Sequence, residues 1–190
     1  MTSYKQQLVK QLVGVDAQRL VVRHRSNLHF TAIDATSFPS QFPIDVEYLR
    51  LRKPITILCE GLLMYLTFAE KQQVFANVRE ILEIHGGVWI TPDLITQDDL
   101  NHLRQISPGL QRLNQTASIV SRRSINNYHF ENLDHVKRFA YEQGFWVEEY
   151  STLDVMDQLT CLEALGINSD VASSILACLS VFALTLCNSA

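Results

Sequence analysis

Apolar runs and amphipathic stretches alternate along the chain, and this alternation predicts strands separated by helices. The clearest apolar run, Ile55–Leu58, follows Pro54 and is rich in β-branched residues. Such a run is typical of a strand buried on both faces in the middle of a parallel sheet. We therefore expect residues 55–59 at or near the centre of a sheet. Further strands are expected at 28–34, 88–93, 145–150 and 181–186.

A helix is expected after this strand and its turn. Thr67 and Glu70 have the T-x-x-E spacing of a capping box. The apolar residues that follow recur at helical spacing until Gly86-Gly87, which predicts a helix over 68–85. Residues 94–130 are polar and only weakly periodic, so we expect a helical insertion there that covers the strand ends as a lid. Other helices are expected at 3–13, 133–143, 153–165 and 169–180.

Three of the expected strands end in a carboxylate, at Asp34, Glu60 and Asp93. Strands alternating with helices indicate an α/β fold with a parallel sheet, in which strand 55–59 is flanked by the strands ending at Asp34 and Asp93. The carboxyl ends of parallel strands meet at one edge, where open α/β folds bind ligands. Three carboxylates there favour a ligand with positive charge, or with hydroxyl or amino donors. We expect a single domain over residues 1–190.

Composition narrows the classes of function. The net charge is −4 and basic residues form no block, so nucleic acid is not expected as a partner. The four cysteines are scattered without a C-x-x-C, which argues against a metal site and favours free thiols in a reducing cytoplasm. The longest apolar run, 175–186, is interrupted by Ser180 and Thr185 and is shorter than the ~20 residues that a bilayer requires. We expect a cytoplasmic protein without a membrane partner.

The turn after strand 55–59 contains a more specific motif. Residues Cys59–Leu66 read C-E-G-L-L-M-Y-L, which resembles the E-G-L-L-x-Y-L signature of the leucine carboxyl methyltransferase family. That family includes bacterial O-methyltransferases linked to polyketide biosynthesis. The resemblance extends upstream to the strand ending at Asp34 and downstream to the strand ending at Asp93. Beyond residue 94, only the order of helices and strands supports it.

The resemblance implies a Rossmann-like class I methyltransferase sheet and S-adenosylmethionine as the cofactor. The methyl acceptor would be a carboxylate or hydroxyl of a small molecule or a protein C-terminus. The resemblance also implies that the last strand, 181–186, pairs antiparallel with strand 146–150. We expect this pairing, although the two intervening helices would also permit a parallel crossover.

The resemblance places Asp34 and Ala35 by the adenine, and Glu60 at the cofactor. A carboxylate can accept a hydrogen bond from the adenine amino group, and another can lie near the ammonium or sulfonium charge. Alternatives remain open for both acids. Asp34 would otherwise form an Asx turn, and Glu60 would cap the following helix, although Thr67 already supplies that cap.

Two further residues are candidates for contact with the substrate. Tyr65 either faces the substrate or belongs to the core. Arg123, next to Arg122, either holds an acidic substrate or lies in a solvated loop. A hydroxyl acceptor would also need a general base. The candidate bases, each also explained as a surface histidine, are His102, His129 and His135.

The sequence departs from the family pattern at its start. None of the seven glycines forms a G-x-G turn, and no strand ending in an acid for the ribose hydroxyls precedes the first helix. We expect an N-terminally truncated chain that lacks a β-α-β unit of roughly 30 or more residues, and that is a poor or inactive methyltransferase alone. The sheet edge uncovered beside strand 28–33 would favour self-association.

Two other classes of function are considered. The alternative to an enzyme is a non-catalytic remnant or binding module that keeps the second half of the fold. A nicotinamide-dependent oxidoreductase is disfavoured because no glycine fingerprint precedes a helix.

Overall fold

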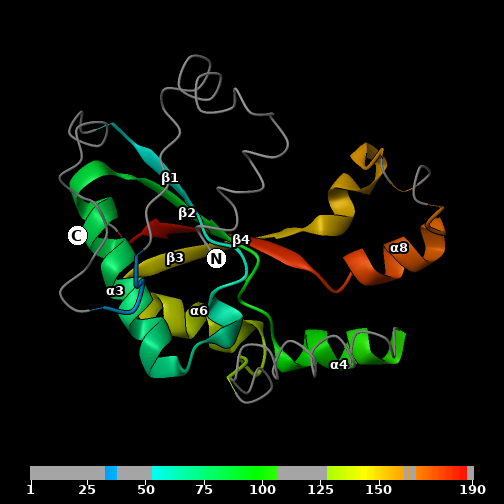
Figure 1. Ribbon diagram of the computed structural model, residues 1–190, viewed down its shortest axis with the longest axis horizontal. Coiled ribbons are helices and arrows are strands. Elements are labelled where there is room, and N and C mark those ends of the chain that lie inside the picture. Colours follow the sequence, from blue (N-terminus) through cyan, green and yellow to red (C-terminus); the bar gives the residue numbers. More distant parts are fainter. Residues whose placement is uncertain (1–32, 38–52, 107–127, 161, 163–165, 188–190) are drawn as a thin grey trace, which may run out of the picture. The chain divides into compact units, whose positions relative to one another are not determined.

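The computed structural model describes residues 33–37, 53–106, 128–160, 162 and 166–187 (Figure 1). The chain divides into two compact units, residues 1–34 and residues 35–190. Of the first unit only Ile33 and Asp34 are described, and neither lies in a helix or strand. The predicted helix 3–13 and the rest of strand 28–34 lie outside the described residues. The single-domain organisation expected for 1–190 stays a prediction.

A mixed four-stranded sheet forms the centre of the second unit (Figure 1). Its strands are β1 (Ile55–Leu58), β2 (Gly87–Thr91), β3 (Phe145–Ser151) and β4 (Ser180–Leu186), in the spatial order β1-β2-β4-β3. β1 and β2 run parallel, and β4 runs antiparallel to both β2 and β3. The expected α/β class is therefore confirmed, as is the antiparallel pairing of the last strand with strand 145–151.

The prediction that strand 55–59 is buried on both faces is wrong. Its predicted place at the sheet centre stays a prediction, because most of the expected neighbouring strand 28–34 lies outside the described residues. Among the described strands, β1 pairs with β2. Ile55 and Ile57 pack against the core, whereas Leu58 on the opposite face is 71% exposed. An unbroken apolar run indicates a strand but not how many of its faces are covered, because the covering elements lie elsewhere in the sequence.

Helix α3 (Phe68–His85) begins and ends where the sequence predicts. Thr67 Oγ1 accepts a hydrogen bond from the Glu70 backbone N–H at 3.2 Å, and Glu70 Oε2 accepts one from the Thr67 N–H at 2.8 Å. The expected capping box is therefore confirmed. Immediately after the helix, a side chain at Gly87 would lie 1.9 Å from the Ile55 carbonyl oxygen, so only glycine lets β1 and β2 pair at this point.

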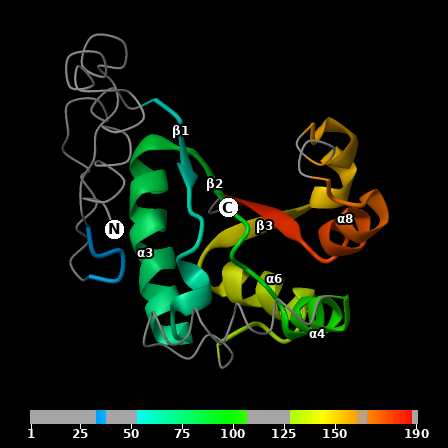
Figure 2. The same ribbon diagram turned by 45° about the vertical axis from the view of Figure 1, so that its right-hand side comes forward.

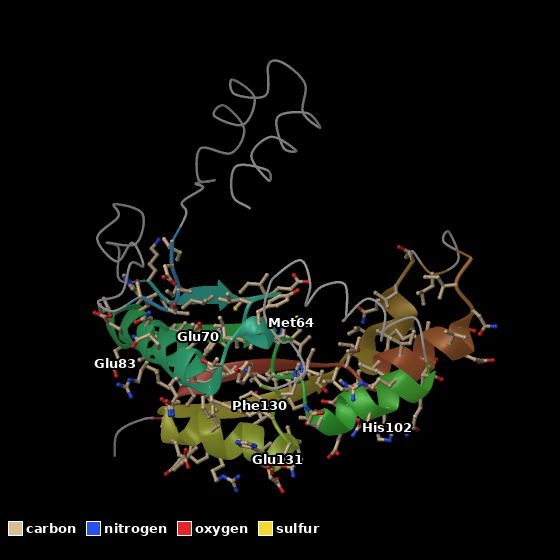
Figure 3. All side chains as sticks on the ribbon, turned by 60° about the horizontal axis from the view of Figure 1, so that its bottom comes forward. Met64, Glu70, Glu83, His102, Phe130 and Glu131 are labelled. Carbon is tan, nitrogen blue, oxygen red and sulfur yellow. The ribbon has the colours of Figure 1, made fainter. Side chains whose placement is uncertain are left out.

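The main hydrophobic core is built by α3 and α6 (Leu133–Glu142), which both pack against the sheet (Figure 2). Phe75 of α3 makes edge-to-face contacts with Trp89, Phe139 and Phe145 at centroid distances of 4.6, 5.2 and 5.5 Å. Aromatic pairs of this geometry contribute about 0.5–1.5 kcal/mol each beyond their burial. Phe130 lies between α3 and α6, against Phe139 (Figure 3).

The remaining elements lie at the carboxyl end of β2. Helix α4 (Gln97–Ile106) belongs to the predicted insertion 94–130, whose ends are joined by a parallel bridge between Thr96 and Phe130. Residues 107–127 lie outside the described residues, and the lid function stays a prediction.

The last two helices differ from the predicted ones. The expected helix 153–165 begins as a 3-10 helix, η3 (Thr152–Gln158), and α8 (Ser169–Leu176) ends before residue 180. Asn168 caps α8, because its Oδ1 accepts a hydrogen bond from the Asp170 N–H at 2.8 Å. In the described ranges, no helix has the length and apolar character needed to cross a bilayer.

Candidate functional site

Two carboxylates lie at the carboxyl edge of β1 and β2. The strands pair in register, Leu58 opposite Ile90, so the turns that follow them lie side by side. Glu60 follows β1 and is exposed, whereas Asp93 follows β2 and is 5% exposed. Both line the same pocket. Of the three acids expected at one edge of the sheet, Glu60 and Asp93 therefore meet there.

The Asp93 carboxylate holds the turn that contains Glu60. Its Oδ1 accepts one backbone hydrogen bond at 2.9 Å, and its Oδ2 accepts two, at 2.7 and 2.9 Å. The three donors are successive N–H groups, those of Gly61, Leu62 and Leu63. They precede or open the 3-10 helix η1 (Leu63–Tyr65), where backbone N–H groups otherwise have no partner. Asp93 thus binds the protein's own backbone, a role that its place at a strand end did not reveal.

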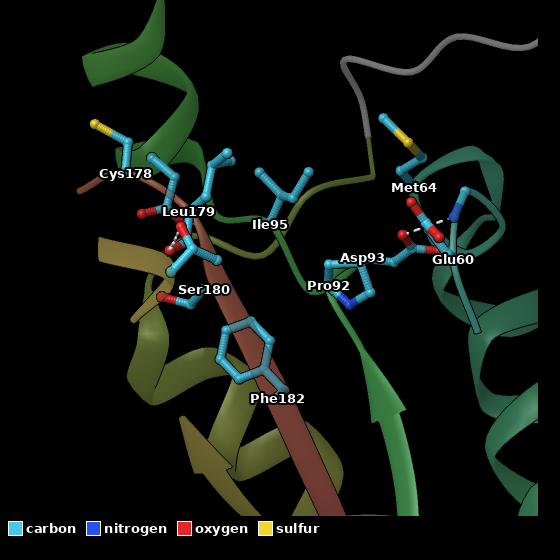
Figure 4. Close-up of a pocket in the computed structure, with 12 residues that line it drawn as sticks. Glu60, Met64, Pro92, Asp93, Ile95, Cys178, Leu179, Ser180 and Phe182 are labelled. Carbon is cyan, nitrogen blue, oxygen red and sulfur yellow. Dashed lines mark hydrogen bonds between the residues drawn. The ribbon is translucent and has the colours of Figure 1, made fainter. Parts of the chain in front are cut away.

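A pocket of about 280 Å³ opens beside this turn (Figure 4). Glu60, Asp93 and Met64 lie on one side of it, and Cys178 and Ser180, from the junction of α8 and β4, lie on the other. Its apolar wall is formed by Met64, Pro92, Ile95, Leu179 and Phe182. The pocket is thus a mainly apolar hollow with acids at one side.

Most polar side chains of the pocket already have partners within the protein. Their hydroxyl, thiol and carboxylate groups bond to neighbours at distances between 2.7 and 3.4 Å. The pairs are Asp99 with Thr96, Thr152 with Leu176, Cys178 with Ser174, and Ser180 with Glu149. Glu60 differs, because within the described residues its side chain makes no hydrogen bond or ion pair. Glu60 is therefore the polar group that the pocket offers to a ligand.

Cys59, immediately before Glu60, is a shielded thiol. Burial, and next the negative charge of Asp93, raise the pKa of Cys59 from 9.0 to about 12, and only its hydrogen bond with Thr91 opposes them. The thiolate is the reactive form of cysteine, so Cys59 is not a nucleophile at neutral pH.

We expect Cys59 to react with iodoacetamide at pH 8 at least about 30-fold more slowly in the folded protein than in the urea-unfolded chain. Raising the pKa from 9.0 to about 12 lowers the thiolate fraction about 1,000-fold, and the greater nucleophilicity of the more basic thiolate recovers only part of this loss. Mass spectrometry of the Cys59 peptide over time measures both rates. Equal rates in the two states would contradict the shielding.

Two other residues predicted to contact the cofactor or substrate, Ala35 and Tyr65, are described in the second unit, and neither lines the pocket. Ala35 packs against the core, and its carbonyl accepts a hydrogen bond from Asn77 Nδ2 at 2.8 Å. Tyr65 is half-buried in η1 and does not line the pocket. Asp34 is exposed in the first unit, and Arg123 lies outside the described residues.

No histidine of the described residues lines the pocket. His102 is exposed on α4 (Figure 3), and His135 stacks on Phe68 with ring centroids 5.6 Å apart. His129 is 7% exposed, so its interpretation as a surface histidine is wrong. None of the three is placed to act as a base in this pocket.

Lys71 is a buried cation that was not among the predicted site residues. Its side chain is 1% exposed, and Nζ donates hydrogen bonds to the carbonyl oxygens of Leu66 at 2.8 Å and Tyr128 at 2.5 Å. Nζ also lies 5.0 and 5.6 Å from the ring centroids of Phe68 and Phe130, within range of cation–π attraction. Lys71 therefore joins the end of η1 to the segment around Tyr128.

The electrostatics of Lys71 follow from its burial. Burial lowers the pKa of Lys71 from 10.5 to about 8, against the opposing charges of Glu70 and Asp93. Its position was detectable in the sequence, because Lys71 precedes Val74 and Phe75 by three and four residues and so shares their buried stripe on α3.

No protein-family model matches this chain, and no curated protein is similar to it at a significant level. Within the described residues, no three His, Cys, Asp or Glu side chains are grouped so that they could hold a metal ion.

Proposed function

We propose that this protein is an S-adenosylmethionine-dependent O-methyltransferase, in which Glu60 lies beside the positively charged end of the cofactor. The observation that carries the proposal is a carboxylate that has no partner among the described residues, on a fixed turn at the carboxyl edge of two parallel strands. The bound cofactor would supply a methyl group on a sulfonium ion. A carboxylate 4 Å from a positive charge near a protein surface is attracted by about 4 kcal/mol.

Two further features support the proposal. The turn that contains Glu60 is held by Asp93 rather than left mobile, so the carboxylate is positioned before a ligand arrives. The last strand, β4, pairs antiparallel with β3, as the resemblance to class I methyltransferases implies. The pocket of about 280 Å³ is at the small end of ligand sites, which suits one part of a cofactor and acceptor pair.

A non-catalytic binding module is the second candidate. It is favoured by the absence of a G-x-G turn among the seven glycines of the 190 residues. Without that turn, several hydrogen bonds to the cofactor are missing, each worth about 1.5–3 kcal/mol where a charged group takes part. Measurement of cofactor binding separates the two candidates.

We expect the 190-residue chain to bind S-adenosylmethionine weakly but saturably, with a dissociation constant of about 0.1–1 mM in a ligand-observed NMR titration. S-adenosylhomocysteine, which lacks the sulfonium charge, should bind about tenfold more weakly. Glu60→Gln should remove this preference, because it removes the charge that distinguishes the two ligands. The matched variant Glu142→Gln, at an exposed site on α6, should keep it.

The result can go against the proposal in two ways. If neither ligand saturates the protein at about 10 mM, the non-catalytic module is the better description. If binding saturates but the preference for the charged ligand survives in Glu60→Gln, then Glu60 does not contact the sulfonium end.

A further inference from the structure

The described lining of the pocket beside Glu60 has acidic side chains and no basic side chain. Glu60, Asp93 and Asp99 belong to its lining, whereas no Lys, Arg or His of the described residues does. Both Asp93 oxygens and Asp99 Oδ2 accept hydrogen bonds from N–H or O–H groups, as ionised carboxylates do. Like charges repel at short range, so an anionic ligand is disfavoured in this space.

Among the described residues, the pocket lining also offers no free donor of the kind that an anion requires. A carboxylate ligand is usually held by backbone N–H groups at a helix start, but Asp93 already takes those of the turn after Glu60. The hydroxyls of Thr152 and Ser180 and the thiol of Cys178 donate to the protein's own acceptors. Glu60, in contrast, is an acceptor with no partner in the described residues.

The rest of the wall favours an apolar body. Met64 and Ile95 are half-buried, and Phe182 is 3% exposed, so its ring is fixed within the core. In Figure 4, Ile95 and Phe182 border the space between the Glu60 side and the Cys178 side. A ligand entering there removes apolar surface of both walls from water.

We propose that this pocket binds a small, mainly apolar molecule that has no negative charge and presents a hydroxyl or amino donor to Glu60. The inference rests on the proposed function only in identifying this molecule as the methyl acceptor. On that basis, the acceptor group is a hydroxyl rather than a carboxylate. One carboxylate at the junction can serve both molecules in an in-line displacement. As the acceptor oxygen bonds to the methyl carbon and the methyl–sulfur bond breaks to leave a neutral thioether, Glu60 would take the proton of the hydroxyl.

Four matched probes test the selectivity without any cofactor. They are 4-methylphenol, 4-methylbenzylamine, 4-methylbenzoate and toluene, titrated into the 190-residue chain at pH 7.5. The phenol and the amine should bind at least tenfold more tightly than the benzoate, a difference of about 1.4 kcal/mol. The affinity of toluene should lie between the affinities of the phenol and the amine and that of the benzoate. Shifts of the Met64 and Ile95 methyl signals in NMR spectra locate the binding.

Variants of Glu60 make the test specific. Glu60→Gln should weaken binding of the amine about tenfold, and Glu60→Lys should make the benzoate the preferred probe. Glu142→Gln should leave the ranking unchanged, and circular dichroism checks that each variant is folded. The inference is overturned if the benzoate binds as tightly as the phenol, if Glu60→Gln binds the amine as tightly as the original protein does, or if no probe shifts the pocket signals. Because S-adenosylmethionine is absent, these results are independent of whether the cofactor binds.

Discussion

Replacement of Asp93 by alanine is expected to lower the free energy of unfolding by about 3–5 kcal/mol. The carboxylate accepts three backbone hydrogen bonds, and Asp93 is 5% exposed. A hydrogen bond to a charged group contributes about 1.5–3 kcal/mol, and a buried N–H without a partner costs about 1–3 kcal/mol. Three bonds on one side chain are not independent, so the expected loss is smaller than their sum. Urea denaturation followed by circular dichroism measures it.

Two further variants serve as controls for the Asp93→Ala measurement. Asp93→Asn keeps one acceptor oxygen and should lower the free energy of unfolding about half as much, by roughly 1.5–2.5 kcal/mol. Asp157→Ala removes an exposed carboxylate from η3 and should change the free energy of unfolding by less than about 0.5 kcal/mol. Hydrogen exchange adds a local measurement, since the Gly61–Leu63 amides should lose protection in Asp93→Ala before the middle of α3 does. If Asp93→Ala is as stable as Asp157→Ala, the carboxylate does not hold the turn.

Those features that depend on neighbouring residues could be predicted from the sequence. Thr67 and Glu70 are three residues apart, and their reciprocal hydrogen bonds form the capping box of α3. The glycines after His85 end that helix for an equally local reason, because they adopt positive φ angles. The strands at 145–151 and 180–186 were detectable because their apolar and β-branched residues form short runs.

Features that depend on distant residues could not be predicted in this way. The elements that pack on the faces of β1 lie elsewhere in the sequence. The apolar run at 55–58 therefore did not show that Leu58 is exposed. An acid at a strand end has the same appearance whether it faces a ligand or binds backbone. Only the fold distinguishes Glu60, which has no partner in the described residues, from Asp93, which has three partners 30 to 32 residues away in the sequence.

The buried ammonium group of Lys71 should make stability rise with pH in the alkaline range. The pKa of Lys71 falls from 10.5 to about 8 in the folded protein, chiefly because burial disfavours the charged form. Between these values the unfolded chain binds more protons than the folded protein, so the free energy of unfolding increases as the pH rises from 8 to 10.5. The full pKa difference corresponds to a gain of about 3 kcal/mol in the free energy of unfolding. This gain is present above pH 10.5 and is lost as the pH falls from 10.5 through 8.

Comparison with Lys71→Met isolates this contribution, because methionine fills similar space without a titratable group. The stability of the original protein minus that of Lys71→Met should increase by up to about 3 kcal/mol between pH 7 and pH 10.5 in urea titrations. Cys59, with its raised pKa, makes stability fall above pH 9, but it is present in both proteins and cancels. Lys137→Met, which removes an exposed lysine of α6, should show no such increase. A difference that stays flat for Lys71→Met would mean that the Leu66 and Tyr128 carbonyls and the two phenylalanine rings fully compensate the burial of the charge.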